Sequence, residues 1–268
     1  MAPLPGGYHD LLHALLRTVS GDDRIAALWV SGSVARGVAD AGSDLDVIVT
    51  VRDEHVEAFA DGWRGWLDTW ADVVLARELP GSTGSFVATT RDCLRVDVIT
   101  ESVSPLPETP YRHRLVLLDH TGLVDRLRAP AEEARTPDLP ALGDLVEEFL
   151  RQQAIFPAAV VGRQDWLLGV VGVHNTQRLL YSLFAASNEP LPVMGVKQWS
   201  SRLSPEQREI LAALSAPSAS RDSVVTAMQQ TRGVFRSAGR ARAEQVGVTW
   251  PTDVDDAVAA YWHREGLE

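Results

Sequence analysis

Two aspartates separated by one residue carry the clearest chemical signal in this sequence. Asp44 and Asp46 flank Leu45 at the start of an apolar run that ends at Val51. Side chains alternate along an extended strand, so both carboxylates would face one side while Leu45 faces the core. Neighbouring carboxylates repel each other unless a cation lies between them, and hard oxygen ligands suit Mg²⁺. The spacing therefore predicts a magnesium site.

A glycine-rich turn precedes these acids and carries groups that suit phosphate. Gly32 and Ser33 follow the apolar run 26–30, and Arg36 and Gly37 come soon after. Glycine adopts conformations that are forbidden to other residues and lets a bulky anion approach the backbone. The Ser33 hydroxyl and the Arg36 guanidinium add hydrogen-bond donors. We expect this turn to bind a triphosphate, and a phosphate site beside a metal site indicates nucleotide chemistry.

The pattern Gly-Ser-x-x-x-Gly followed by Ser-Asp-x-Asp resembles the signature of the polymerase-beta-like nucleotidyltransferase superfamily and, within it, the small antibiotic-modifying members. The resemblance implies a third carboxylate on a later strand, and Asp97 in the strand-like run 94–100 matches it. It also implies that Asp44, Asp46 and Asp97 bind two Mg²⁺ ions and that a nucleoside monophosphate is transferred with loss of pyrophosphate. Two metal ions that clamp the entering and leaving oxygens suit such a displacement.

The resemblance also suggests site residues in the second half of the chain. The stretch 144–150 is similar to the start of the second domain in kanamycin-type enzymes, where a glutamate acts as general base, and Glu148 is our choice for this role. The alternative is a solvated acid in the first turn of a helix. In the streptomycin/spectinomycin type the third-strand acid is the general base, so Asp97 would both bind the metal and accept the proton. The stretch 195–200 resembles the one that carries a phosphate-contacting lysine in that type, which implies this role for Lys197.

Apolar periodicity predicts the elements that position these residues. In the first half we expect helices over 8–19 and 54–70, and strands over 26–30, 47–51, 72–76, 85–89, 94–100 and 114–119. In the second half we expect helices over 142–156, 166–187, 205–214, 221–245 and 254–262. The predicted fold class is α/β (α+β): a mixed nucleotidyltransferase sheet with flanking helices, followed by a C-terminal helical bundle.

A proline-rich stretch separates the two halves. We expect a catalytic domain over 1–129, a linker over 130–140 and a helical substrate-binding domain over 141–268. Proline and small residues are typical of such boundaries.

Composition narrows the class of protein. The 268 residues are 45% hydrophobic, which is ample for buried cores. The chain starts with no signal-peptide pattern, and its longest uncharged apolar stretch is shorter than the roughly 20 residues of a membrane span, so we expect a cytoplasmic protein with no membrane partner. The formal net charge of −11 disfavours nucleic acid as a partner and favours a cationic small molecule.

Two other residues are interpreted as structural. The single cysteine, Cys93, excludes an intramolecular disulfide, and we expect a small buried hydrophobe there. His174 lies on an apolar helix face, where a core residue is expected more often than a metal ligand.

Together these patterns predict an adenylyltransferase that uses Mg²⁺ and transfers AMP from ATP to a hydroxyl of a small cationic acceptor. An aminoglycoside-type antibiotic is the leading acceptor, and we expect it in a cleft between the two domains. The acids expected to bind it are Asp144, Glu147, Glu148 and Asp165. The alternatives are nucleotidylation of a lincosamide or a protein side chain, and a catalytically degenerate nucleotide-binding or antitoxin-like protein. The set of three acids argues against the degenerate protein, because a mere binder does not need two metal ions.

Overall fold

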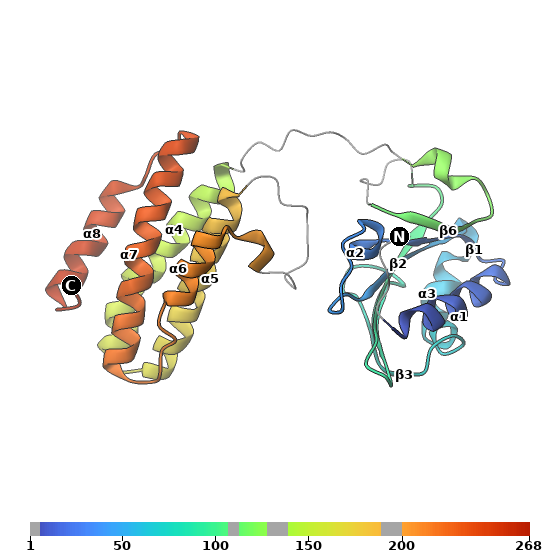
Figure 1. Cartoon of the computed structure of the whole chain (residues 1–268), viewed down its shortest axis with the longest axis horizontal. Helices are drawn as coiled ribbons and strands as arrows, with labels where there is room; N and C mark the ends of the chain where they lie inside the picture. Colours follow the sequence, from blue (N-terminus) through green and yellow to red (C-terminus); the bar gives the residue numbers. More distant parts are fainter. Residues whose placement is uncertain (1–5, 107–112, 128–138, 189–199) are drawn as a thin grey trace. The chain divides into compact units, whose positions relative to one another are not determined.

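The computed structural model describes residues 6–106, 113–127, 139–188 and 200–268. The chain divides into two compact units, Met1–Glu133 and Ala134–Glu268. The first is built on a β-sheet and the second consists of helices (Figure 1). Most of the range 130–140 lies outside the described residues, and α4 begins at Leu139, so the division into 1–129, a linker and 141–268 stays a prediction.

The N-terminal unit contains a six-stranded mixed sheet in the order β3-β4-β5-β2-β1-β6. Its strands are β1 (Ile25–Val30), β2 (Leu45–Val51), β3 (Val73–Glu78), β4 (Phe86–Thr90), β5 (Arg95–Ser102) and β6 (Leu115–Asp119). The pairing of β2 with β5 is parallel, and the other four pairings are antiparallel. A mixed sheet beside helices and ahead of a helical unit confirms the predicted α+β class. The strands β4 and β5, which follow each other in the chain, pair antiparallel as a hairpin.

Two helices cover one face of this sheet, α1 (Tyr8–Ser20) and α3 (Val56–Leu67). Their apolar side chains recur every three or four residues, so each helix buries one stripe. Leu15 of α1 and Phe59 of α3 are fully buried and belong to one cluster with Val47 and Val98 of the sheet. The alternate residues of β2 and β5 therefore point to the opposite face, away from both helices.

That opposite face is apolar over its middle part. Trp29 of β1 and Ile48 of β2 pack there with Leu106 and with Leu123 of the short helix η2 (Leu123–Arg126). The Trp29 indole Nε1 donates a hydrogen bond of 2.8 Å to Thr50 Oγ1. Leu106 after β5 and Leu123 after β6 thus cover the part of this face where Ile48 lies, two residues beyond Asp46.

The C-terminal unit is a bundle of long helices with short ones between them. Its elements are α4 (Leu139–Phe156), η3 (Pro157–Val161), α5 (Trp166–Ser187), η5 (Ser200–Arg202), α6 (Pro205–Ala213), α7 (Arg221–Val246) and α8 (Thr252–Arg264). Phe149 of α4 and Phe235 of α7 stack with ring centroids 3.6 Å apart. None of the described helices combines the length and the apolar character needed to cross a membrane.

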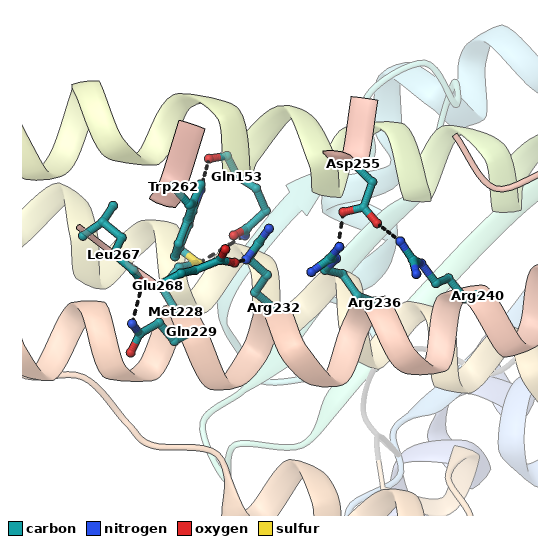
Figure 2. A network of polar contacts seen from close by, with 10 residues as sticks. All are labelled: Gln153, Met228, Gln229, Arg232, Arg236, Arg240, Asp255, Trp262, Leu267 and Glu268. Carbon is teal, nitrogen blue, oxygen red and sulfur yellow. Dashed lines mark hydrogen bonds and ion pairs between the residues drawn. The ribbon is translucent and has the colours of Figure 1, made fainter. Parts of the chain in front are cut away.

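Ion pairs join α7 to α8 and to the residue Glu268 after it, and two of their members, Asp255 and Arg232, are buried (Figure 2). Asp255 of α8 is fully buried and lies 2.7 Å from Arg236 Nε and 2.6 Å from Arg240 Nη2. Arg232, one turn earlier on α7, pairs with Glu268. Burial lowers the pKa of Arg232 to about 10, so the guanidinium stays protonated at neutral pH. Since an unpaired buried charge is costly, these pairs fix how the two helices pack.

Two side chains differ from their predicted surroundings. Cys93 is exposed, in the turn before β5, with a φ of 60°. His174 is exposed on α5. Both predictions of burial were wrong. The exposure of these residues depends on where the turn or the helix face lies in the fold, and the residue type alone does not show this.

Candidate active site

Strand pairing brings the aspartates of β2 and β5 together. β2 and β5 run parallel with Asp46 opposite Asp97. Leu45, Val47 and Val96 on either side are buried in the core beneath α1 and α3. Because side chains alternate along a strand, Asp46 and Asp97 both stand on the opposite face.

Asp44 completes the group from the residue just before β2. Carboxylate oxygens of Asp44, Asp46 and Asp97 all lie within 4.8 Å of one another. Asp44 is 7% exposed, and the other two are half-buried. The structure thus brings together the three acids that the sequence marked as metal ligands.

A turn stabilised by its own side chains leads into Asp44. The Asp40 amide donates to Ser43 Oγ at 2.9 Å, and Ser43 Oγ donates to Asp40 Oδ1 at 3.1 Å. The Gly42 amide donates to the same carboxylate oxygen at 2.9 Å. Asp and Ser are common in turns because their side chains bond to nearby backbone in this way. The serine of the Ser-Asp-x-Asp pattern therefore orders the approach to Asp44.

Gly32 lies directly against one of the acids. It has a φ of +62°, and a Cβ added to it would lie 1.7 Å from Asp46 Oδ2. The Ser31 amide before it donates to the carbonyl oxygen of Asp46 at 2.9 Å. Any side chain at position 32 would therefore displace the Asp46 carboxylate. The sequence predicted Gly32 for a close approach by phosphate, and the contact observed is a close approach by the acid.

The residues after Gly32 form the short helix α2 (Gly32–Ala35) where a turn was expected. Val34 is fully buried and anchors this segment in the core. Ser33 Oγ and Arg36 Nε are both buried, and neither has a hydrogen-bond partner among the described residues. Buried polar atoms usually have partners, because leaving them unpaired costs free energy. Unpaired donors beside an acidic group are suited to a bound anion.

Glu148 belongs to the helical unit and is engaged in an ion pair. Its two carboxylate oxygens accept from Arg151 Nε at 2.6 Å and from Arg151 Nη2 at 2.7 Å, and Gln152 Nε2 donates at 2.7 Å. The hydrogen bonds from Arg151 and Gln152 lower the pKa of Glu148 to about 2. A carboxylate of such low pKa is a weak base, and its role as general base stays a prediction. Lys197 lies outside the described residues.

One ion pair on the face that carries the acids was not predicted from the sequence. Arg114 makes two hydrogen bonds to Glu101, of 2.9 and 3.1 Å, and both side chains are at most 10% exposed. The Arg114 guanidinium also lies over the Trp29 ring, 5.4 Å from its centroid. Glu101 comes four residues after Asp97 on β5, so the period of two already placed both acids on one face. The spacing of four residues from Asp97 would have been enough to predict from the sequence that Glu101 lies on this face.

Comparison with protein families gives the N-terminal unit its class. Residues 12–107 match the family model described as a nucleotidyltransferase domain. This part of the chain is a nucleotidyltransferase domain. It includes β1, β2 and β5, and therefore Gly32 and all three acids. The match confirms the resemblance to nucleotidyltransferases and the predicted enzyme class, a nucleotidyltransferase.

Comparisons with whole proteins are less informative. No curated protein matches the chain. Among solved structures, the chain is similar to an aminoglycoside 6-adenyltransferase from Bacillus subtilis, with 16% identity, a TM-score of 0.46, and 97% of each chain covered. It is also similar to the CD-NTase CdnG from Bradyrhizobium diazoefficiens in complex with GTP, with 13% identity, a TM-score of 0.33, and 90% of this chain and 87% of that chain covered. At these TM-scores neither likeness carries a conclusion about this chain.

The three acids of the nucleotidyltransferase domain fit a divalent cation. All the donor atoms are carboxylate oxygens, which are the hard ligands that Mg²⁺ prefers. Gly32 leaves room for the Asp46 carboxylate at a point that any Cβ would fill. Like charges held this close are stabilised by a cation between them. The acidic group therefore can hold a metal ion.

Proposed function

We propose that the chain transfers AMP from ATP to a hydroxyl group of a small cationic molecule, with Mg²⁺ bound by Asp44, Asp46 and Asp97. The observation that carries this proposal is the convergence of three carboxylates next to a segment with unpaired buried donors. A nucleoside triphosphate combines a metal-binding triphosphate with the anionic oxygens that such donors bind. The resemblance of the motif to antibiotic-modifying nucleotidyltransferases favours an aminoglycoside-type acceptor.

Ser33, Arg36 and Lys197 are the proposed phosphate ligands. Ser33 Oγ and Arg36 Nε are two of the buried polar atoms without a partner in the described residues, and a triphosphate oxygen accepting from them would remove the cost of leaving them unpaired. The charge of Arg36 strengthens its hydrogen bond to a phosphate oxygen. Lys197 is proposed from the resemblance alone.

The reaction exchanges a phosphoanhydride bond for a phosphoester bond. The acceptor hydroxyl oxygen forms a bond to the α-phosphorus of ATP, and the bond from that phosphorus to the bridging oxygen of the β-phosphate breaks, which releases pyrophosphate. Mg²⁺ at the three carboxylates would supply charge stabilisation to the entering and leaving oxygens. The chain's own residues orient the triphosphate through Ser33 and Arg36. A carboxylate accepts the hydroxyl proton, and Asp97 and Glu148 are the two candidates.

The acceptor is proposed to be cationic on the grounds of charge. The chain carries a net charge of −11, and Asp144 and Glu147 on α4 are exposed. Two other acids expected to bind the acceptor already have partners, because Glu148 pairs with Arg151 and Asp165 accepts from the Leu168 amide as the N-cap of α5. Ammonium groups make charge-assisted hydrogen bonds to carboxylates, and such attraction weakens as salt rises.

A release assay tests both the chemistry and the acceptor. Purified protein is incubated with each nucleoside triphosphate, Mg²⁺ and one antibiotic at a time, and pyrophosphate is measured at low and at high salt. We expect release with ATP and aminoglycosides, decreasing as salt rises. If pyrophosphate release is salt-independent, or requires a lincosamide or a protein hydroxyl, the proposal of a cationic acceptor is wrong. The proposal of nucleotidyl transfer would still hold. Absence of pyrophosphate release with every nucleotide and acceptor would contradict the whole proposal.

A further inference from the structure

Arg95 connects two of the segments that carry the proposed metal ligands. It is the first residue of β5 and lies two residues before Asp97, so both side chains leave the strand on the same face. Arg95 Nη2 donates a hydrogen bond of 2.6 Å to the carbonyl oxygen of Gly42. Gly42 lies in the turn 40–43, two residues before Asp44. The Arg95 guanidinium thus joins the strand of one acid to the turn that precedes another.

The backbone of Arg95 is itself held in place. Its amide donates to the hydroxyl of Tyr8 at 3.0 Å, and Tyr8 is a buried residue of α1 that belongs to the core under the sheet. The arginine therefore reaches the turn from a fixed position. A charged donor makes a stronger hydrogen bond to a carbonyl than a neutral donor makes, and a distance of 2.6 Å is short for such a bond.

We propose that Arg95 is a positioning residue for the metal site: by holding the turn 40–43 against β5, it keeps the Asp44 carboxylate within reach of Asp46 and Asp97. The inference rests on the proposed function, because it assumes that these acids bind Mg²⁺. The turn has its own internal bonds between Asp40 and Ser43, which set its shape. Pairing of β2 with β5 starts only at Leu45, and the bond from Arg95 to Gly42 ties the turn itself to β5.

The ordinary alternative is an exposed arginine that makes a surface hydrogen bond of little consequence. Exposed interactions contribute little to stability, so thermal unfolding alone does not separate the two cases. Metal affinity does separate them, because residues that orient metal ligands typically change affinity by roughly 10- to 100-fold when replaced. Arg95 acts through the backbone of a turn, so we expect a loss of about tenfold, at the lower end of that range.

The experiment measures binding of Mg²⁺ and Mn²⁺ by titration calorimetry, together with thermal unfolding, for three variants. Arg95→Gln removes the charged donor, and Arg95→Lys keeps the charge and one donor. Arg91→Gln is the control, because Arg91 lies in the β4–β5 connection just before the strand of Arg95, is 69% exposed and pairs with Asp72 instead of the turn. We expect a metal Kd about tenfold higher in Arg95→Gln, partial recovery in Arg95→Lys, no change in Arg91→Gln, and similar Tm values throughout.

A second variant loosens the same turn from its other side. Ser43→Ala removes the bonds to Asp40 and should also weaken metal binding. If wild type binds the metal and Arg95→Gln binds it equally well, Arg95 has no positioning role and the proposed function is unaffected. If wild type itself binds neither metal, the metal site of the proposed function fails and the inference about Arg95 fails with it.

Discussion

Replacing Gly32 by alanine tests the geometry of the acidic site most directly. The substitution adds one methyl group, which would lie 1.7 Å from Asp46 Oδ2 and 2.4 Å from the Asp46 Cγ. Real Cβ atoms essentially never approach another heavy atom closer than 3.0 Å. Either the carboxylate or the backbone at the start of α2 must therefore move by more than about 1 Å, and a misplacement of that size typically costs about a hundredfold in rate.

The same substitution also strains the backbone. Gly32 has a φ of +62°, and a residue with a Cβ in this left-handed region costs about 1–2 kcal/mol. Gly81 in the turn between β3 and β4 provides a matched control, since it has a φ of +73° and nothing lies within 4 Å of an added Cβ. Both variants should lose similar stability from strain, and the Gly32 variant alone should lose the position of Asp46.

Three measurements on each variant distinguish strain from displacement. Thermal or urea unfolding should show a loss of at least 1–2 kcal/mol in Gly32→Ala and about 1–2 kcal/mol in Gly81→Ala. Titration with Mg²⁺ should show weakened binding only in Gly32→Ala. Pyrophosphate release should fall by about a hundredfold or more in Gly32→Ala and stay within a fewfold of wild type in Gly81→Ala. Equal metal affinity and equal turnover in the two variants would refute the argument that Gly32 makes room for Asp46.

Other substitutions test the charges around this site. Asp97→Asn should leave the Tm unchanged or raised, because it removes one of three crowded carboxylates, and should lower pyrophosphate release by about a thousandfold or more. Glu101→Gln should lower the urea-unfolding free energy by about 3–5 kcal/mol, since it leaves the buried Arg114 charge without its partner. The ion pair of Glu148 holds the pKa of that carboxyl at about 2, below its usual value, so the pair stabilises the folded chain above the usual pKa. This small stabilisation should disappear as the pH falls toward 2, and Arg151→Gln should remove it at neutral pH, which a pH series of unfolding curves would measure.

The elements that position the acids were predictable because their patterns are local. Alternation of Asp46 and the buried valines in β2 and β5 predicted both strands and the faces of their side chains. The helix 166–187 was predicted with the bounds that α5 has, because Asp165 precedes it and a proline-containing segment follows in the sequence. The pairing of β2 with β5, which sets Asp46 opposite Asp97, cannot be predicted from a local pattern. The resemblance to a known signature supplied that step.

Features that depend on contacts between distant residues were beyond the sequence. Position 32 requires glycine because a Cβ there would overlap an oxygen of Asp46. Asp46 lies fourteen positions later in the chain, and only the fold brings the two residues together. The π-helical segment Pro157–Val161 and the short helix α2 were missed, since neither is long enough to show a period. The pair of Glu148 with Arg151 was available in principle, because residues three apart on a helix are neighbours.

The position of Glu148 bears on which carboxylate accepts the proton of the acceptor hydroxyl. Both oxygens of Glu148 are engaged by Arg151 and one of them also by Gln152, so the group would have to leave these partners before it became an effective base. Asp97 already stands with Asp44 and Asp46, where the entering oxygen must bind if the metal does. The ion pair therefore favours Asp97 for both tasks. Since Arg151→Gln removes the ion pair of Glu148, an unchanged pH profile of pyrophosphate release in that variant would support this assignment, and a profile whose acid limb moves to higher pH would return the role to Glu148.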